Sequence, residues 1–431
     1  MLLTLTRSMQ LYQLLRLGSV VLTSILLAKS GLSLGEIGAY EALLYIGSVA
    51  AFFWANGLLQ GIAPVYARLD ERERPAFLFS VFGLFCGAAL VVSATIWFSQ
   101  QWAVPALTGF GGVPGLGWFV LYLFFNLATL PVEHLYLLRE KPLALAGWGG
   151  ASFGLYVVAL AGPVFCGWSL QAGLQALAGL GALRFLWAVG LMAKQGACHW
   201  RPDLLRQYGW FSAPLVANLL VGNLVLLFDS WLVGWHFQDE SVFALFRYGS
   251  REFPLATALA TALGTAMTAH IAANPAITGL TELKNQGTRL FHVVFPSTIV
   301  LLFLSNKLFP IVFSPAFAAA APLFNIYLLL TASRVLLPNA IVLAKGQPRA
   351  ILAVGLAELA IKIILGLLFV QAWGLAGLAW SAVLAFWVEK IGLIWYLEKR
   401  MGVRTSDWLD LRWYMGYVMA LLLAWQVSTL L

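Results

Sequence analysis

The sequence predicts an all-α integral membrane protein with two six-helix bundles related by a parallel repeat, which supply twelve core transmembrane helices, and a C-terminal thirteenth span. Apolar residues make up 61% of the 431 residues and charged residues 10%, whereas charged residues are near a quarter of a soluble domain. Thirteen predominantly apolar stretches are each close to the ~20 residues that cross a bilayer. The connections between them alternate between basic and nearly uncharged.

These apolar stretches follow one another with short connections. The expected spans are 9–30, 36–66, 76–98, 115–138, 143–166, 170–193, 209–236, 241–272, 289–313, 320–344, 350–372, 374–397 and 412–430. The longest outer connection, residues 99–115, carries no charged side chain. A polysaccharide polymerase or ligase, which needs a sizeable outer loop, is therefore disfavoured. The sequence has no metal-ligand cluster, nucleotide-binding loop or nucleophile with a base at useful spacing, so we expect no enzyme activity, cofactor or metal.

Lysine and arginine concentrate on one side of the membrane. Of the 26 such residues, seventeen lie on one side, two (Lys29 and Lys307) lie on the other, and seven lie within spans. Because positively charged loops stay in the cytoplasm, the N-terminus and every even-numbered loop are predicted to be cytoplasmic. The net charge of +8 reflects this topology, and we expect no nucleic-acid partner.

Reporter fusions test this orientation. Fusions that follow the basic loops should report the cytoplasm, and fusions at the uncharged loops should report the outside. The first group follows Arg74, Lys141, Arg206, Lys284 and Arg349, and the second lies near Gly112, Gly167 and Asp239. If the fusions at 284 and 167 reported the same side, the division into six plus six helices would be wrong.

The two halves of the sequence resemble each other at an offset of about 204–207 residues. Pro131 and the run Leu137–Pro142 recur as Pro338 and the run Val342–Pro348. Because six is even, both halves enter from the same side, as in parallel repeats that place a cavity between two bundles. The alternative is chance similarity among apolar helices. The predicted units are an N-terminal bundle (1–200), a C-terminal bundle (205–400) and an extra helix (411–431).

Several charged residues fall inside the predicted spans, where each costs about 2.5–3.5 kcal/mol on insertion scales. Glu358 and Lys362 are four residues apart, so we predict a structural ion pair on one helix face, with a position on a cavity wall as the alternative. Glu389 and Lys390 lie toward an inner end, where a long side chain can extend to the interface.

Arg247, Arg251 and Arg334 form the main candidate for a substrate-binding site. Arg247 and Arg251 are four residues apart in the eighth span, so we expect them to stack on one helix face, about 6 Å apart along its axis. Two like charges repel unless an anion lies between them. Asp229 and Glu252 could supply that anion in a structural network. A diphosphate could also supply it, because arginine makes forked contacts with phosphate oxygens.

The N-terminal half offers a second set of charges. Arg16 and Arg184 could contribute positive charge to a substrate site. Glu133 and His134 lie just past Pro131, which is the arrangement of either a proton-coupled site or a capped helix kink. We favour the kink.

Several motifs occur in a characteristic order along residues 10 to about 400. They are Leu32–Tyr40, Gly57–Pro64, Asp229 followed by Phe243, Phe246 and Tyr248, Lys345–Arg349, and Trp373–Ala379. Their order resembles that of the bacterial polysaccharide-biosynthesis flippases, which handle O-antigen-type lipid-linked oligosaccharides. That family belongs to the multidrug/oligosaccharidyl-lipid/polysaccharide exporter superfamily. His270 departs from the pattern, because many relatives carry proline near the end of helix eight.

The resemblance implies a flippase that moves polyprenyl-diphosphate-linked oligosaccharide from the inner to the outer leaflet by alternating access, for cell-surface polysaccharide synthesis. A cation-coupled multidrug antiporter and a lipid II flippase are the alternatives. The implied location is the bacterial cytoplasmic (inner) membrane, and the implied partners are the lipid-linked substrate, membrane lipids and glycan-assembly proteins, with the chain itself a monomer. The predicted substrate contacts are Arg247, Arg251, Arg334, Arg184 and Arg16, with Asp229, Glu252 and Glu133 as coupling groups or charge partners.

Overall fold

The computed structural model describes residues 4–194, 199–274 and 277–430, and within these ranges the chain is helical and has no β-strand. Met1, the first residue of the predicted N-terminal bundle, and Leu431, the last residue of the predicted extra helix, lie outside these ranges. The helices are α1 (Leu5–Lys29), α2 (Leu34–Phe52), α3 (Ala55–Tyr66), α4 (Arg74–Thr108), α5 (Leu116–Thr129), α6 (Val132–Leu138), α7 (Pro142–Phe165), α8 (Leu170–Ala193), α9 (Pro202–Phe237), α10 (Glu240–Gly249), α11 (Pro254–Ala273), α12 (Ile277–Val312), the 3-10 helix η1 (Pro315–Ala320), α13 (Ala321–Leu328), α14 (Leu330–Arg334), α15 (Pro338–Ala344), α16 (Pro348–Met401), α17 (Thr405–Trp408) and α18 (Leu411–Ser428).

The predicted all-α membrane fold is confirmed. The described residues contain nine helical segments that are long and apolar enough to cross a membrane, or up to eleven if each of two bent helix pairs is one span. The predicted thirteenth span corresponds to α18, which is not among these segments, because Arg412 and Gln426, with several tyrosine and tryptophan side chains, lower its mean hydropathy.

Breaks within the helices account for much of the difference from thirteen separate spans. The predicted span 36–66 is the pair α2 and α3, which is bent by 46°, and α9 is bent by 57° near residues 218–221. The spans 350–372 and 374–397 are the two halves of α16. They meet at Gly374, whose φ of 57° and ψ of −136° are tolerated essentially only by glycine.

The start of α2 shows how local sequence sets a helix boundary. Ser33 is the N-cap, and its hydroxyl accepts a hydrogen bond from the Glu36 backbone N–H at 3.2 Å, while the Glu36 carboxylate accepts from the Ser33 backbone N–H at 2.9 Å. This reciprocal pair satisfies two backbone donors that the first turn would otherwise leave unpaired.

The described chain divides into two compact units. The first unit comprises residues 1–223 and 234–244, and the second comprises residues 224–233 and 245–431. Residues 224–233 belong to α9, so this helix contributes to both units. The predicted boundary between residues 200 and 205 falls at the start of the same helix.

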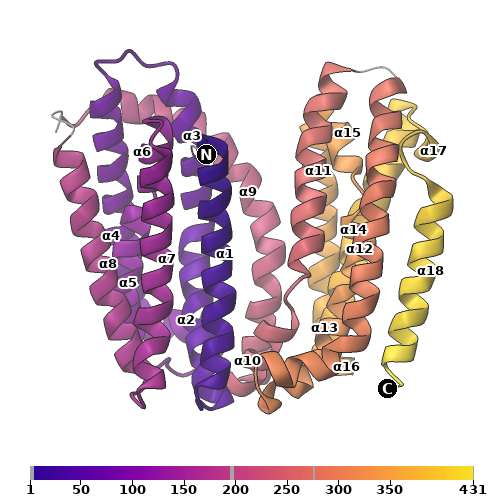
Figure 1. The fold of residues 1–431 in the computed structure, drawn as a ribbon, viewed down its shortest axis with the longest axis horizontal. Coiled ribbons are helices and arrows are strands. Elements are labelled where there is room, and N and C mark those ends of the chain that lie inside the picture. The colour runs from indigo at the N-terminus through magenta and orange to yellow at the C-terminus, as the bar shows by residue number, and fades with distance from the viewer. Residues whose placement is uncertain (1–3, 195–198, 275–276, 431) are drawn as a thin grey trace. The chain divides into compact units, whose positions relative to one another are not determined.

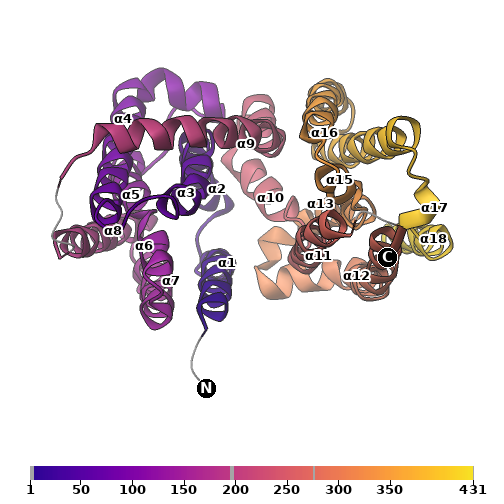
Figure 2. The ribbon, with the colours of Figure 1, turned by 90° about the horizontal axis from the view of Figure 1, so that it is seen from above.

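The first unit is held together by contacts among α1, α4, α5, α7 and α8. Figure 2 shows α1 beside α7, and the Tyr12 and Phe153 rings meet between them edge to face, with centroids 5.1 Å apart. The Tyr40 and Tyr156 hydroxyls, 2.7 Å apart, link α2 to α7. Large aromatic side chains with satisfied hydroxyls therefore form much of this interior.

In the second unit, α11 packs against α12 and α15, and α16 packs against α13 and α15. The terminal helix α18 lies beside α12 at the edge of this unit, with α17 at one end of α18 and the C-terminus at the other (Figures 1 and 2). The Tyr414 hydroxyl of α18 donates to the Ala332 carbonyl at 2.9 Å, and the Tyr417 ring stacks on Phe295 at 5.2 Å. The extra helix is thus anchored by hydrogen bonding and by ring packing.

Candidate functional site

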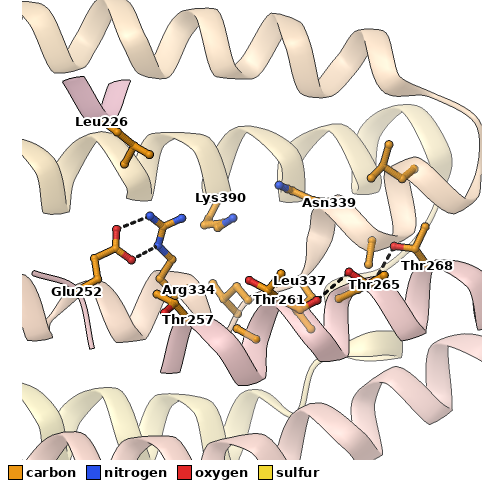
Figure 3. Close-up of a pocket in the computed structure, with 15 residues that line it drawn as sticks. Leu226, Glu252, Thr257, Thr261, Thr265, Thr268, Arg334, Leu337, Asn339 and Lys390 are labelled. Atoms are coloured by element: carbon orange, nitrogen blue, oxygen red, sulfur yellow. Dashed lines mark hydrogen bonds and ion pairs between the residues drawn. The ribbon is translucent and has the colours of Figure 1, made fainter. Parts of the chain in front are cut away.

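A polar pocket of about 470 Å³ lies within the second unit. Its walls come from α11, from the segment between α14 and α15, and from α16, with Leu226 of α9 at one end (Figure 3). Its polar lining residues are Glu252, Thr257, Thr261, Thr265, Thr268, Arg334, Asn339 and Lys390. The volume falls in the range of small-molecule sites, and leucines, two alanines and a glycine supply the apolar part of the lining.

One end of this pocket is closed by a forked ion pair. Arg334 Nε donates to Glu252 Oε2 at 3.0 Å, and Arg334 Nη2 donates to Glu252 Oε1 at 2.5 Å (Figure 3). Glu252 can reach Arg334 because α10 ends at Gly249 and α11 begins at Pro254, which leaves a non-helical segment between them. The Arg334 guanidinium also lies over the Phe386 ring, 4.0 Å from its centroid. The pair therefore engages two of the five Arg334 donors and both oxygens of the Glu252 carboxylate.

A second charge pair lies on the opposite wall from the threonines. Lys390 Nζ is 2.9 Å from Glu389 Oε2, and Asn339 Nδ2 donates to Glu389 Oε1 at 2.9 Å. The Lys390 residue is buried, with 6% of its surface exposed. The prediction that these two charges simply extend to the interface is wrong, because each finds its partner within the bundle.

Four threonines form one wall of the pocket along α11 (Figure 3). Their spacing of four, four and three residues places them on one face of the helix. Three of the hydroxyls donate to backbone carbonyls of their own chain segment: Thr257 to Pro254 at 3.1 Å, Thr265 to Thr261 at 2.9 Å, and Thr268 to Gly264 at 2.8 Å.

The predicted pair between Glu358 and Lys362 is wrong, since Lys362 pairs with Asp229. Lys362 Nζ lies 2.8 Å from both carboxylate oxygens of Asp229, and the Tyr327 hydroxyl donates to Asp229 Oδ2 at 3.2 Å. The helix spacing identified a suitable partner on α16, but the tertiary packing brings α9 close enough to supply a better one. Asp229 is therefore a charge partner of a buried lysine in this structure.

The expected stacking of Arg247 and Arg251 on one helix face is also wrong. Arg247 lies in the last turn of α10, whereas Arg251 lies beyond its end at Gly249, because the chain leaves the helix before Pro254. Arg247 Nη1 lies 3.4 Å from the Ser230 hydroxyl, and the Arg251 guanidinium lies over the Tyr248 ring at 4.5 Å. Both arginines remain in the second unit, close in sequence to Glu252.

The predicted charges of the N-terminal half lie around the buried Tyr12 of the first unit, with Glu133 buried and Arg16 exposed. Arg16, Glu133 and Arg184 all act electrostatically on the hydroxyl of the buried Tyr12. The Arg184 guanidinium lies 5.5 Å from the centroid of the Trp148 ring, and its Nε atom is buried and has no hydrogen-bond partner among the described residues. The three residues thus form one cluster that joins α1, α6 and α8.

The helix break at Pro131 is present as predicted. α5 ends at Thr129, and α6 begins at Val132, so Glu133 lies in the first turn of a helix, where the helix dipole favours a carboxylate. The His134 Nδ1 atom is 3.6 Å from Glu133 Oε1. This geometry is consistent with the kink, and a proton-coupling role for Glu133 stays a prediction.

The structure therefore brings only part of the predicted site together. Arg334 and Glu252 meet in the pocket, Asp229 lies in a separate ion pair, and Arg16, Arg184 and Glu133 belong to the other unit. The sequence analysis missed Asn339 and the threonines of α11. Their spacing at residues 257, 261, 265 and 268 was the available signal, since it predicts a polar stripe along an otherwise apolar helix.

No family model matches the sequence, and no curated protein sequence matches it. Solved structures match along almost the whole chain. A lipid II flippase, MurJ, in an inward closed conformation aligns with a TM-score of 0.71 and 15% identity, covering 97% of this chain and 98% of the flippase. An inward-facing multidrug resistance MATE transporter of the MOP superfamily aligns with a TM-score of 0.60 and 14% identity, covering 95% of each chain.

A MOP superfamily transporter from Pyrococcus furiosus aligns with a TM-score of 0.56 and 14% identity, covering 97% of this chain and 95% of the transporter. These similarities extend over both helical units. The chain therefore has the fold shared by the solved transporters of the MOP superfamily, with two repeated helical bundles.

Proposed function

We propose that this protein is a flippase that moves polyprenyl-diphosphate-linked oligosaccharide from the inner to the outer leaflet of the bacterial cytoplasmic membrane by alternating access. Cell-surface polysaccharide synthesis would consume the exported unit, and glycan-assembly proteins would be its partners. The fold supports a transporter rather than an enzyme, because the structures that share it include a lipid II flippase and multidrug transporters. The lipid-linked substrate class comes from the order of the sequence motifs.

Charge neutralisation inside the second unit is the observation that best supports this proposal. Three acidic residues within or between its predicted spans each pair with a basic residue: Asp229 with Lys362, Glu252 with Arg334, and Glu389 with Lys390. An exporter of cationic drugs needs an acid-dominated cavity to hold its substrate. Paired carboxylates do not supply one, so these three pairs disfavour the multidrug antiporter, whereas the buried Glu358, for which no ion pair is found among the described residues, favours it.

In this proposal the substrate diphosphate is bound by Arg247 and Arg251. Both are arginines, whose planar fork suits phosphate oxygens. Arg247 lies in the last turn of α10, and Arg251 lies in the break between α10 and α11. Glu252 directly follows Arg251 in the sequence, and Arg334 is paired with Glu252 at one end of the pocket. Arg16 and Arg184 contribute positive charge from the first unit, and Asp229 and Glu133 act as charge partners or coupling groups.

A lipid II flippase is the second candidate. The similarity to MurJ favours it, since that structure aligns with a TM-score of 0.71 over nearly the full length of both chains. Lipid II and lipid-linked oligosaccharides share a polyprenyl diphosphate, so the arginines have the same role in both proposals. Only the carbohydrate distinguishes the two substrates.

A reconstituted transport assay tests the proposal. The purified full-length chain in liposomes should accelerate the movement of a fluorescent polyprenyl-diphosphate oligosaccharide between leaflets, measured by a membrane-impermeant quencher. Protein-free liposomes are the control. Faster movement of lipid II alone would support the second candidate. Gradient-driven transport of the cationic dye rhodamine 6G, with neither lipid moved, would contradict both and indicate a drug antiporter.

A further inference from the structure

We infer that the pocket between α11, α15 and α16 is a subsite for uncharged, hydroxyl-bearing sugar rings and not for the diphosphate. We call it the threonine pocket, defined by Thr257, Thr261, Thr265, Thr268 and Asn339. The inference rests on the proposed function in one respect, because the sugar is taken to be the carbohydrate part of the transported lipid.

The charges at the threonine pocket cancel. Arg334 is held by Glu252 through two hydrogen bonds, and Lys390 is paired with Glu389 at 2.9 Å. A diphosphate would have to displace a forked carboxylate from Arg334, which is itself a strong charge-assisted contact. The charged groups that line the pocket are therefore each neutralised by a partner, and the buried Glu358 carboxyl lies near them without lining the pocket.

The threonine wall offers hydrogen-bond acceptors. A hydroxyl has one donor hydrogen and two acceptor sites. Thr257, Thr265 and Thr268 already direct their hydrogens to backbone carbonyls at 3.1, 2.9 and 2.8 Å. Only oxygen lone pairs of these three hydroxyls then remain for a ligand, and a ligand that fits must bring its own O–H or N–H donors.

Asn339 provides a further acceptor on the facing wall. Its Nδ2 group donates to the Glu389 carboxylate at 2.9 Å, and because a carboxylate only accepts, this bond sets the orientation of the amide. Its Oδ1 atom is buried and has no hydrogen-bond partner among the described residues. A buried acceptor without a partner is costly, and a sugar hydroxyl would satisfy it once a small movement of the side chain exposes Oδ1 to the pocket.

The remaining lining suits a sugar ring rather than a small inorganic ion. Leu226, Leu336, Leu337 and Leu343 line the pocket beside the polar groups. Sugar rings present apolar C–H faces and a rim of hydroxyl donors, so they match both kinds of surface. An organic cation would also bring donors in some cases, but the neutral lining offers no net charge to hold it.

Protection of a single cysteine from alkylation tests the inference. We would replace Cys86, Cys166 and Cys198 with serine and introduce Leu343→Cys, which keeps every threonine; Cys198 lies outside the described residues. The full-length protein in nanodiscs would be alkylated with N-ethylmaleimide in the presence of chitobiose, lactose or maltose. At least one disaccharide should slow alkylation about threefold, which corresponds to a concentration of about twice its Kd.

Matched variants separate hydroxyl recognition from packing. In the Leu343→Cys background, Thr261→Val with Thr265→Val removes acceptors at nearly constant shape and should abolish the protection. The corresponding serine pair should retain it. Thr95→Val on α4 is the control, since Thr95 also donates to the carbonyl four residues earlier, at 2.8 Å, but lies outside the pocket.

Saturation-transfer NMR of the same disaccharides gives a second measurement that needs no thiol. Signal that the valine pair loses and the serine pair keeps would support the inference. Protection by inorganic diphosphate or rhodamine 6G without protection by any sugar would overturn it, as would the absence of both protection and saturation transfer.

The two proposals can fail separately. Lipid flipping that is unchanged in the valine pair, with no sugar binding, would reject the threonine pocket and keep the proposed function. Sugar protection that the valine pair abolishes, in a protein that moves no lipid-linked oligosaccharide in liposomes, would keep the pocket and reject the function.

Discussion

Replacement of Lys362 by methionine is expected to lower the free energy of unfolding by about 3–5 kcal/mol, because it leaves the buried Asp229 carboxylate without its cation. Lys362 has 1% of its surface exposed and Asp229 has 8%, and the ammonium lies 2.8 Å from both carboxylate oxygens. Unfolding in mixed detergent and SDS micelles would measure the change. Lys345→Met is the control, since Lys345 is exposed and such changes usually fall within about 0.5 kcal/mol.

The double variant Asp229→Asn with Lys362→Met should recover most of that stability, since it removes both charges together. The same variants separate the two roles of Asp229 in transport. If Asp229 only neutralises Lys362, Asp229→Asn should destabilise the protein and leave residual transport. If Asp229 is a coupling acid, transport should lose its response to an ion or proton gradient with stability intact. A stable Lys362→Met protein would contradict the buried ion pair.

Replacement of both Arg247 and Arg251 by glutamine is expected to abolish export of the glycan while the protein still inserts and folds. Glutamine keeps much of the side-chain length but removes the charge that the diphosphate requires. Lysine at both positions should retain part of the activity, because a point charge survives although the forked geometry does not. Flipping in liposomes and expression level in the membrane would be measured together.

The matched control for this pair is Lys345→Gln with Arg349→Gln, which removes two exposed charges, one just after α15 and one in the first turn of α16. That variant should transport normally once it is inserted. Full export by the Arg247 and Arg251 glutamine variant, at normal expression, would remove both arginines from the mechanism. Arg247 lies in α10, and Arg251 lies in the break between α10 and α11. The double variant therefore tests two side chains that extend from different backbone segments.

The amino-acid sequence was enough to predict that this protein lies in a lipid bilayer and where most of its helices are. Apolar stretches of bilayer length can satisfy their backbone polar groups only as helices in lipid, so composition and spacing were enough to predict an all-α membrane fold. Local sequence signals also mark helix boundaries: Ser33 and Glu36 form the start of α2, and Pro131 separates α5 from α6. The thirteenth span was placed correctly as a helix, although it is less apolar than a bilayer span.

The pairing of the charges depends on the tertiary structure and could not be predicted from the sequence. Lys362 had a plausible partner four residues away at Glu358, but Asp229, more than a hundred residues earlier, lies within 2.8 Å of it. Spacing along one helix shows which residues share a face and not which other helix covers that face. For the same reason the sequence did not predict the pairing of Glu252 with Arg334, nor the hydrogen bond from Asn339 of α15 to Glu389 of α16. The threonine spacing predicts a polar stripe along α11, but no local pattern in the chain shows which helices, distant in sequence, pack beside that stripe to form the threonine pocket.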